Sequence, residues 1–299
     1  MRRILCPGAN WPVVFSGGGS LGPYLIGAHR CLIECDHELG PYLACSVGCF
    51  VVLMIKNGWS DDRIMQGLVD LFHPRADAIK SALAIPSHKH VSESRQALRY
   101  SPAGDKSKGA SSARIRKLVA FADSSAGVFN LVPYIQTWIE QNELEARNEM
   151  YFYSWDVLND QPLIWSFNEN ERDGFRSQAR LALAMAASSA VPGLFRPVST
   201  VDEDGTARLH IDGGFLHPAM GALFIKPAIV LSLFGAPVSW AYKPDPKDTV
   251  FYVGRPRFPL KPYLTMKEVR DAYAHGYAVV DKNSRKLETM EMFSSLARR

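Results

Sequence analysis

Residues 11–22, with the sequence WPVVFSGGGSLG, decide the fold class. They open with a short apolar run that ends at glycines, which is typical of a buried strand followed by a loop. Apolar residues at helical spacing follow over 21–34, so we expect a helix there. The order of strand, glycine loop and helix is the first unit of a sheet covered by helices.

The next residues repeat this order. Residues 41–45 are a second strand candidate, and residues 47–57 are apolar on all sides and end at Gly58, as in a helix buried under a sheet. Because strands and helices alternate, we predict an α/β fold with a central, mostly parallel sheet. Further helices are expected over 60–72, 129–142, 177–189 and 265–293, and further strands over 149–156, 163–168, 208–211, 228–233 and 249–253. The chain has no internal repeat and no clean linker, so we interpret residues 1–299 as one domain.

The composition is that of a globular protein. With 47% hydrophobic and 21% charged residues, collagen-like, coiled-coil and disordered chains are excluded. No uninterrupted apolar run is longer than seven residues, the length of the run over 49–55. A membrane-spanning helix needs roughly 20. We therefore expect no such helix.

The charge is unevenly distributed along the chain. The net charge of +4 is too small to indicate a nucleic-acid partner, and we expect none. Residues 75–117, however, carry ten basic and three acidic residues, a local charge of +7, in a stretch rich in Ser, Gly, Lys and Pro. We interpret this stretch as a basic lid or insertion. Two readings of its charge stay open, a solvated loop and a peripheral contact with an anionic membrane.

The five cysteines all lie within the first 49 residues. Their odd number and clustering favour reduced thiols in a cytosol-like compartment over a disulfide framework. His29, Cys31, Cys35 and His37 suggest zinc, but residues two apart on one helix point to different faces and cannot converge on one ion.

The N-terminus has no apolar stretch of signal-peptide length, so we expect a cytoplasmic protein, peripheral at membranes if the basic stretch binds lipid. Export without a leader stays open.

The loop at Gly17, Gly18 and Gly19 can hold an anion. Glycines let several backbone N–H groups approach one point, and the following helix adds the partial positive charge of its N-terminus. Such a loop binds a phosphate or the oxyanion of an acyl intermediate. A tight structural turn is one alternative. A dinucleotide site is another, because glycines fall at Gly17, Gly19 and Gly22, but no acidic residue follows the next strand as that site requires.

Two further motifs supply reactive side chains. Residues 44–48, ACSVG, place Ser46 between a strand and an apolar helix, with Ala44 and Gly48 as the small neighbours that a nucleophile elbow needs. Asp212 ends a predicted strand and is followed by Gly213 and Gly214. A serine in a generic turn and an aspartate in an ordinary turn are the alternatives.

Taken together, these motifs resemble those of the patatin-like lipid acyl hydrolases. The glycine loop, the serine elbow and the distal D-G-G occur in the family's order and spacing, and residues 187–195, ASSAVPGLF, resemble the family's segment upstream of the aspartate. The resemblance covers about residues 13–214. It implies a three-layer sandwich in which helices flank a central, mostly parallel sheet.

The resemblance also implies a site. Ser46 is then the nucleophile and Asp212 its only partner, with an oxyanion hole that draws on Gly17, Gly18, Gly19 and Val47. The motif glycines are Gly22, Gly48, Gly213 and Gly214. No metal and no other cofactor is implied. The expected substrate is a phospholipid or a related acyl lipid, cleaved at an ester bond.

The chain departs from the family at two positions. Leu21 stands where Arg or Lys is frequent, and Ala44 replaces the first glycine of the elbow, but neither change removes a reacting group. Two other functions stay open. One is an esterase with a Ser-Asp-His triad, for which His217 and His275 are candidates. The other is a non-catalytic module that holds a phosphate or a lipid in the glycine loop.

Overall fold

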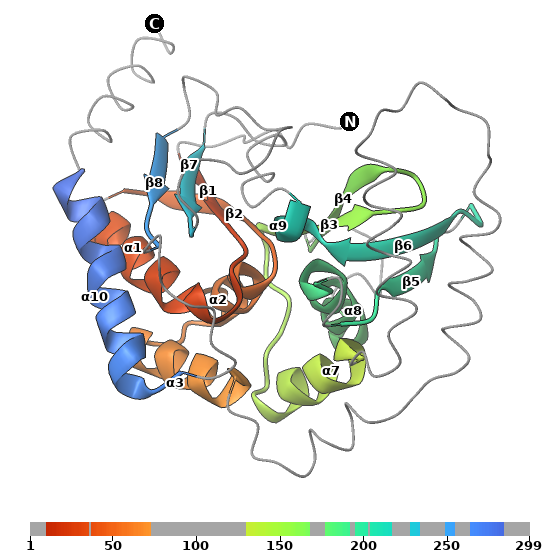
Figure 1. Cartoon of the computed structure of the whole chain (residues 1–299), viewed down its shortest axis with the longest axis horizontal. Helices are drawn as coiled ribbons and strands as arrows, with labels where there is room; N and C mark the ends of the chain where they lie inside the picture. The colour runs from red at the N-terminus through yellow and green to blue at the C-terminus, as the bar shows by residue number, and fades with distance from the viewer. Residues whose placement is uncertain are drawn as a thin grey trace, which may run out of the picture.

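The structure is a computed structural model (Figure 1), and it describes residues 10–35, 37–72, 130–167, 177–191, 195–202, 204–216, 228–233, 249–254 and 264–283. The basic stretch 75–117 and His217 lie outside the described residues. The lid and the single-domain organisation therefore stay predictions.

One sheet of eight strands forms the centre of the described fold. Its order is β5 (Val198–Val201), β6 (Ala207–Asp212), β3 (Met150–Asp156), β2 (Leu39–Ala44), β1 (Trp11–Phe15), β7 (Ile229–Ser232) and β8 (Thr249–Tyr252), with β4 (Gln161–Ser166) paired to β3. The pairings among β3, β2, β1, β7 and β8 are all parallel, whereas β4, β5 and β6 join the sheet by antiparallel pairings. The predicted mostly parallel sheet is confirmed.

Strands β2 and β6 share one edge of β3. Strand β4 pairs with the other edge from Tyr151 to Asp156. On the shared edge, the last residue of β2, Ala44, lies opposite Phe152, whereas the last residue of β6, Asp212, lies opposite Ser154. Because β2 is parallel and β6 antiparallel to β3, their carboxyl ends meet head-on. This arrangement brings the residues that follow β2 close to Asp212.

The helices pack on the sheet as the sequence predicts. They are α1 (Gly22–Glu34), α2 (Val47–Lys56), α3 (Asp61–Phe72), α7 (Leu131–Gln141), α8 (Gln178–Ser189) and α10 (Met266–Lys282), with a 3-10 turn η1 (Gly19–Leu21) and a short α9 (Gly213–Leu216). Their apolar side chains form one core with alternate strand residues such as Phe15, Ala44 and Phe152. Val14 and Leu43 face the opposite side and are also fully buried. Both faces of the sheet are thus shielded, and the α/β fold with flanking helices is confirmed.

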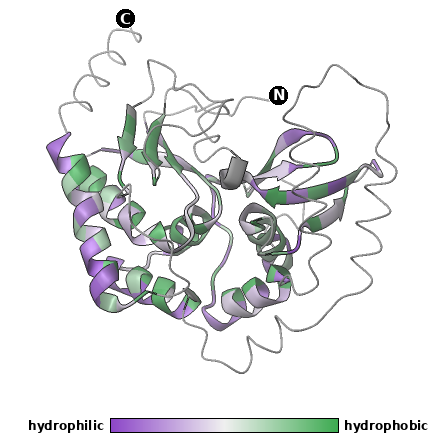
Figure 2. Cartoon of the chain, in the orientation of Figure 1, coloured by the Kyte–Doolittle hydropathy of each residue, from purple (hydrophilic) through white to green (hydrophobic). Residues whose placement is uncertain are grey.

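Helix α10 packs directly on α1 through two glycines. A Cβ at Gly27 would overlap the carbonyl oxygen of Tyr273, and a Cβ at Gly276 would overlap that of Tyr24. The backbones therefore touch. Figure 2 shows α10 with a hydrophilic outer side, as expected for a helix that buries one face only. This contact fixes the helix that follows the glycine loop.

Strand β5 was not predicted from the sequence. Its four residues form a hairpin with β6, from Val198 opposite His210 to Val201 opposite Ala207. A run this short carries too little periodicity to stand out. Strand β4 also begins two residues earlier than predicted, at Gln161, and includes Pro162.

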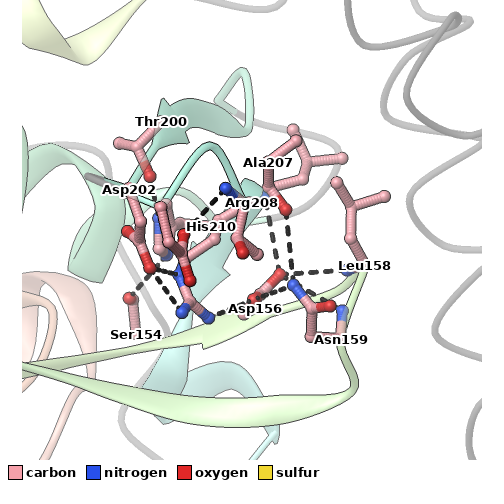
Figure 3. Close-up of polar contacts among 12 residues, drawn as sticks. Ser154, Asp156, Leu158, Asn159, Thr200, Asp202, Ala207, Arg208 and His210 are labelled. Atoms are coloured by element: carbon pink, nitrogen blue, oxygen red, sulfur yellow. Dashed lines mark hydrogen bonds and ion pairs between the residues drawn. The ribbon is translucent and has the colours of Figure 1, made fainter.

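An ion pair with the buried Asp156 holds this hairpin on β3 (Figure 3). Arg208 on β6 contacts Asp156 on β3 at 3.0 Å, and its Nε donates to Asp202 at 2.6 Å. The buried Asp156 carboxylate also accepts the side-chain amide of Asn159 at 2.7 Å. Because the buried charges are paired and hydrogen-bonded, β6 stays aligned on β3 up to its last residue, Asp212.

Two buried histidines are neutral in the folded protein. His210 lies 3.1 Å from the Ser154 hydroxyl and 2.8 Å from the Thr200 hydroxyl. Burial lowers the pKa of His210 to about 4. On α1, His29 lies 3.1 Å from the Tyr42 hydroxyl, and burial, followed by the charge of Arg30, lowers its pKa to about 4 as well.

We predict that acid weakens the fold through these histidines. In the unfolded chain a histidine has a pKa of about 6.5, so between that pH and about 4 the unfolded state binds more protons, and the free energy of unfolding falls as the pH falls. A pKa lowered to about 4 corresponds to a loss of about 3 kcal/mol for His29 over this window. Urea unfolding at pH 7.5 and 4.0 should show a smaller loss in His29→Gln than in the wild type. Equal losses would contradict the prediction.

Candidate active site

Ser46 occupies a strained turn between β2 and α2. Its backbone has φ 52° and ψ −130°, a conformation that costs a non-glycine residue about 1–3 kcal/mol. Gly48 makes the sharp turn possible, because a Cβ there would lie 2.8 Å from the carbonyl oxygen of Phe15. The serine is the N-cap of α2 and is 6% exposed. Strand, sharp turn and buried helix are the context that a nucleophile elbow requires.

The two departures from the family pattern are accommodated by the core. Ala44 is fully buried at the end of β2 and is not among the residues with positive φ, so its methyl group carries no backbone cost. Leu21 is 2% exposed and packs in the main core. A hydrophobic side chain at that position therefore adds to the core rather than to the charge of the site.

The glycine loop lies directly against the elbow. A Cβ at Gly17 would lie 2.9 Å from the Cβ of Ser46 and 3.5 Å from the Cα of Gly214. A Cβ at Gly22, the first residue of α1, would lie 2.7 Å from Val47, the first residue of α2. The N-termini of both helices thus adjoin the loop, and their partial positive charges favour an anion there.

Asp212 reaches the same place from β6. Its carboxylate accepts the N–H of Gly214 at 2.7 Å, and the residue is 2% exposed. A Cβ at Gly214 would lie 3.2 Å from Asp212 Oδ1 and 3.2 Å from the Cα of Gly17. Ser46 and the Asp212 turn therefore both approach the point beside Gly17 where a side chain would stand. Three segments far apart in the sequence converge on this point.

A buried thiol lies beneath the two glycines. Cys45 Sγ donates to the Tyr153 hydroxyl at 2.9 Å, and a Cβ at Gly214 would lie 2.7 Å from this sulfur. Burial, followed by the charge of Asp212, raises the pKa of Cys45 well above its usual range. The thiol therefore stays protonated and fills space, as a buried structural cysteine does.

His275 and the suggested zinc ligands have the following surroundings. His275 on α10 packs edge-on against the ring of Tyr24 on α1, with centroids 5.6 Å apart. Of the suggested zinc ligands, His29 and Cys31 are buried, whereas Cys35 is exposed. In the part of the chain that the structure describes, no group of three or more His, Cys, Asp or Glu side chains could hold a metal ion.

Comparison with known families agrees with this geometry. The model of one family, described as patatin-like phospholipase, matches residues 13–223 and so includes the loop, the elbow and Asp212. The chain belongs to the patatin-like phospholipase family. No curated protein sequence matches it.

Two solved structures resemble this patatin-like chain. VipD from Legionella pneumophila is 13% identical, with a TM-score of 0.38 and 79% of this chain covered. The type III effector protein ExoU is 15% identical, with a TM-score of 0.38 and 94% of this chain covered. The patatin-like chain spans about half of each, 51% and 53% of their lengths.

None of the helices that the structure describes in this chain is long and apolar enough to cross a membrane.

Sequence reasoning missed two residues that support the site. Cys45 has no local signal beyond its place beside Ser46, and its contact with Tyr153 joins the residue after β2 to β3, 108 positions away in the sequence. Ser188 lies in the stretch 187–195 that resembles the family, but its sequence alone does not show that its side chain contacts the elbow.

We predict that Gly214 and Cys45 are coupled through their contact. In Gly214→Ala the new methyl group meets the Cys45 sulfur at 2.7 Å. This overpacking should lower the free energy of unfolding by about 1–3 kcal/mol. Cys45→Ala removes the sulfur, so the double variant should lose less stability than the two single variants together. Urea unfolding of the four proteins measures the coupling, and additive losses would contradict the contact.

Proposed function

We propose that the chain is a serine lipid acyl hydrolase that cleaves ester bonds of phospholipids or related acyl lipids. The observation that carries this proposal is the convergence at Gly17, where the strained Ser46 and the Asp212 turn both approach the position that a side chain would occupy. Membership of the patatin-like phospholipase family supports a lipid substrate. No cofactor and no nucleic acid enter the proposal.

In the proposed mechanism, Ser46 and Asp212 act as a dyad. The Asp212 carboxylate accepts the proton of Ser46 Oγ as that oxygen attacks the ester carbonyl. The tetrahedral intermediate collapses, the C–O bond to the alcohol breaks, and the alcohol oxygen takes the proton from Asp212. Water then attacks the acyl-serine while Asp212 accepts its proton. The acid leaves and the proton returns to Ser46. The burial of both residues excludes water and strengthens the contact between carboxylate and hydroxyl.

The oxyanion hole of the proposal uses backbone N–H groups of Gly18, Gly19 and Val47. Val47 is the first residue of α2, where the helix dipole favours negative charge. The N–H of Gly17 is directed at Cys45 Sγ, so Gly17 contributes mainly by having no side chain between Ser46 and Gly214. Each donor to the oxyanion is worth about 2.7–4 kcal/mol in the transition state.

A purely binding role explains less of the site. A loop that holds phosphate needs the glycines and the helix N-terminus but has no use for a serine in a conformation that costs free energy. A triad would need a histidine at the dyad. His275 instead packs on Tyr24, and His217 lies outside the described residues.

We predict that hydrolysis depends on Ser46 and Asp212 but not on His275. Purified proteins are incubated with mixed phospholipid vesicles, and fatty acid release is followed by mass spectrometry. Ser46→Ala and Asp212→Asn should each lower the release rate by about 10³-fold or more, because nucleophile and base act as one unit. His275→Ala serves as the matched control and should retain the wild-type rate. Loss of activity in His275→Ala would favour a triad, and release by Ser46→Ala would contradict the mechanism.

We also propose that the protein is cytoplasmic and binds membranes peripherally through residues 75–117, on the basis of their local charge of +7. Each Lys or Arg near an anionic surface contributes about 1 kcal/mol, and salt weakens the attraction. In vesicle sedimentation, binding should increase with the fraction of phosphatidylserine and decrease with salt. Reversal of Lys106, Lys108 and Arg114 to Glu should abolish this dependence. Binding that is insensitive to both would contradict the proposal.

A further inference from the structure

We propose that Ser188, at the end of α8, is a positioning residue that holds the backbone of Ser46 in its reactive conformation. This inference rests on the proposed function. The side chain of Ser188 does not enter the reaction. It acts through the elbow.

Ser188 is fully buried and links the elbow to β3. The N–H of Ser46 donates both to the Ser188 carbonyl oxygen at 3.2 Å and to the Ser188 hydroxyl at 3.1 Å. The same hydroxyl donates to the carbonyl oxygen of Tyr153 at 2.7 Å and accepts from Cys49 Sγ at 3.3 Å. The hydroxyl thus uses its one donor and both acceptor positions within the protein.

These bonds matter because of the conformation of Ser46. At φ 52° its N–H is turned toward α8, where it is buried. Without the Ser188 hydroxyl, this N–H keeps the Ser188 carbonyl oxygen at 3.2 Å but loses its bond at 3.1 Å. The elbow also loses the links that the hydroxyl makes to Tyr153 and Cys49, so the strained turn is held by fewer bonds and can relax. Relaxation of the backbone would displace the Ser46 hydroxyl from the Asp212 turn.

The end of α8 also anchors the second reacting residue. The N–H of Asp212 donates to the carbonyl oxygen of Ala190 at 3.0 Å. Ser188 and Ala190 are two positions apart in one chain segment, and each accepts the backbone N–H of one member of the dyad. This segment therefore fixes the position of Ser46 relative to Asp212.

The neighbouring serine provides a matched control. Ser189 is on the same helix and is 7% exposed, but its hydroxyl has no hydrogen-bond partner among the residues that the structure describes. Ser188→Ala and Ser189→Ala each remove one side-chain hydroxyl, and the two positions are adjacent and buried. Only the first removes contacts to the elbow.

The experiment measures kcat and KM with a soluble short-chain nitrophenyl ester, together with the rate of labelling by a fluorophosphonate. Because a misplacement of about 1 Å can cost about 100-fold in rate, we expect kcat and the labelling rate of Ser188→Ala to fall by roughly this factor while KM stays nearly constant. Ser189→Ala should match the wild type. Ser188→Cys, which retains a weaker acceptor and donor, should be intermediate, and it serves as the test if Ser188→Ala does not fold.

The outcomes separate the two proposals. If the wild type is active and Ser188→Ala, or Ser188→Cys in its place, keeps the wild-type kcat and labelling rate, the positioning role is overturned. It is also overturned if KM rises while kcat stays constant, since that change would indicate lost binding. If the wild type neither hydrolyses the ester nor reacts with the fluorophosphonate, the proposed function fails, and this inference fails with it.

Discussion

The structure depends on the way two strands share one edge of β3. Strand β2 arrives parallel to β3 and ends opposite Phe152, and β6 arrives antiparallel and ends opposite Ser154. Each strand can occupy only part of that edge, so their ends must meet. Ser46 and Asp212 are brought together by this hydrogen-bond register, and the register is the same whatever side chains stand at the two ends. The elbow, the glycine loop and the D-G-G turn all pack into the space where the strands meet.

This space leaves no room for ordinary side chains. A Cβ on Gly17 or Gly214 would lie within 3.5 Å of the opposite segment, and a Cβ on Gly48 would meet the backbone of β1. The glycines are thus required by close approach of backbones. The N–H of the strained Ser46 donates to Ser188 at the end of α8, and the hairpin that carries Asp212 is joined to β3 by the ion pair of Arg208 with the buried Asp156. Ser46 at the N-cap of α2 and Asp212 at the end of β6 both stand on regular elements, as the proposed preorganised site requires.

Much of this could be predicted from the sequence, because its signals are local. The apolar run lies directly before the glycines, and the all-apolar helix directly follows Ser46. The predicted sheet is confirmed, and Ser46 lies in a sharp turn between β2 and α2. The hairpin of β5 was missed because its four residues carry little periodicity. The head-on meeting of β2 and β6 and the bonds from Ser188 to Ser46 join distant segments, so no local pattern encodes them. Sequence alone also left His275 open as a base, and its edge-on packing against Tyr24 joins two helices, so no local pattern encodes it.

The central claim is that Ser46 is a nucleophile facing an oxyanion hole formed by the glycine loop and the N-terminus of α2. The most direct test is a crystal structure of the protein after reaction with a fluorophosphonate, which leaves a stable phosphonate on an activated serine. The account predicts a covalent bond to Ser46 Oγ, with the phosphonyl oxygen about 3 Å from the backbone nitrogens of Gly18, Gly19 or Val47. An adduct on another residue, or a phosphonyl oxygen that points away from the glycine loop, would contradict it.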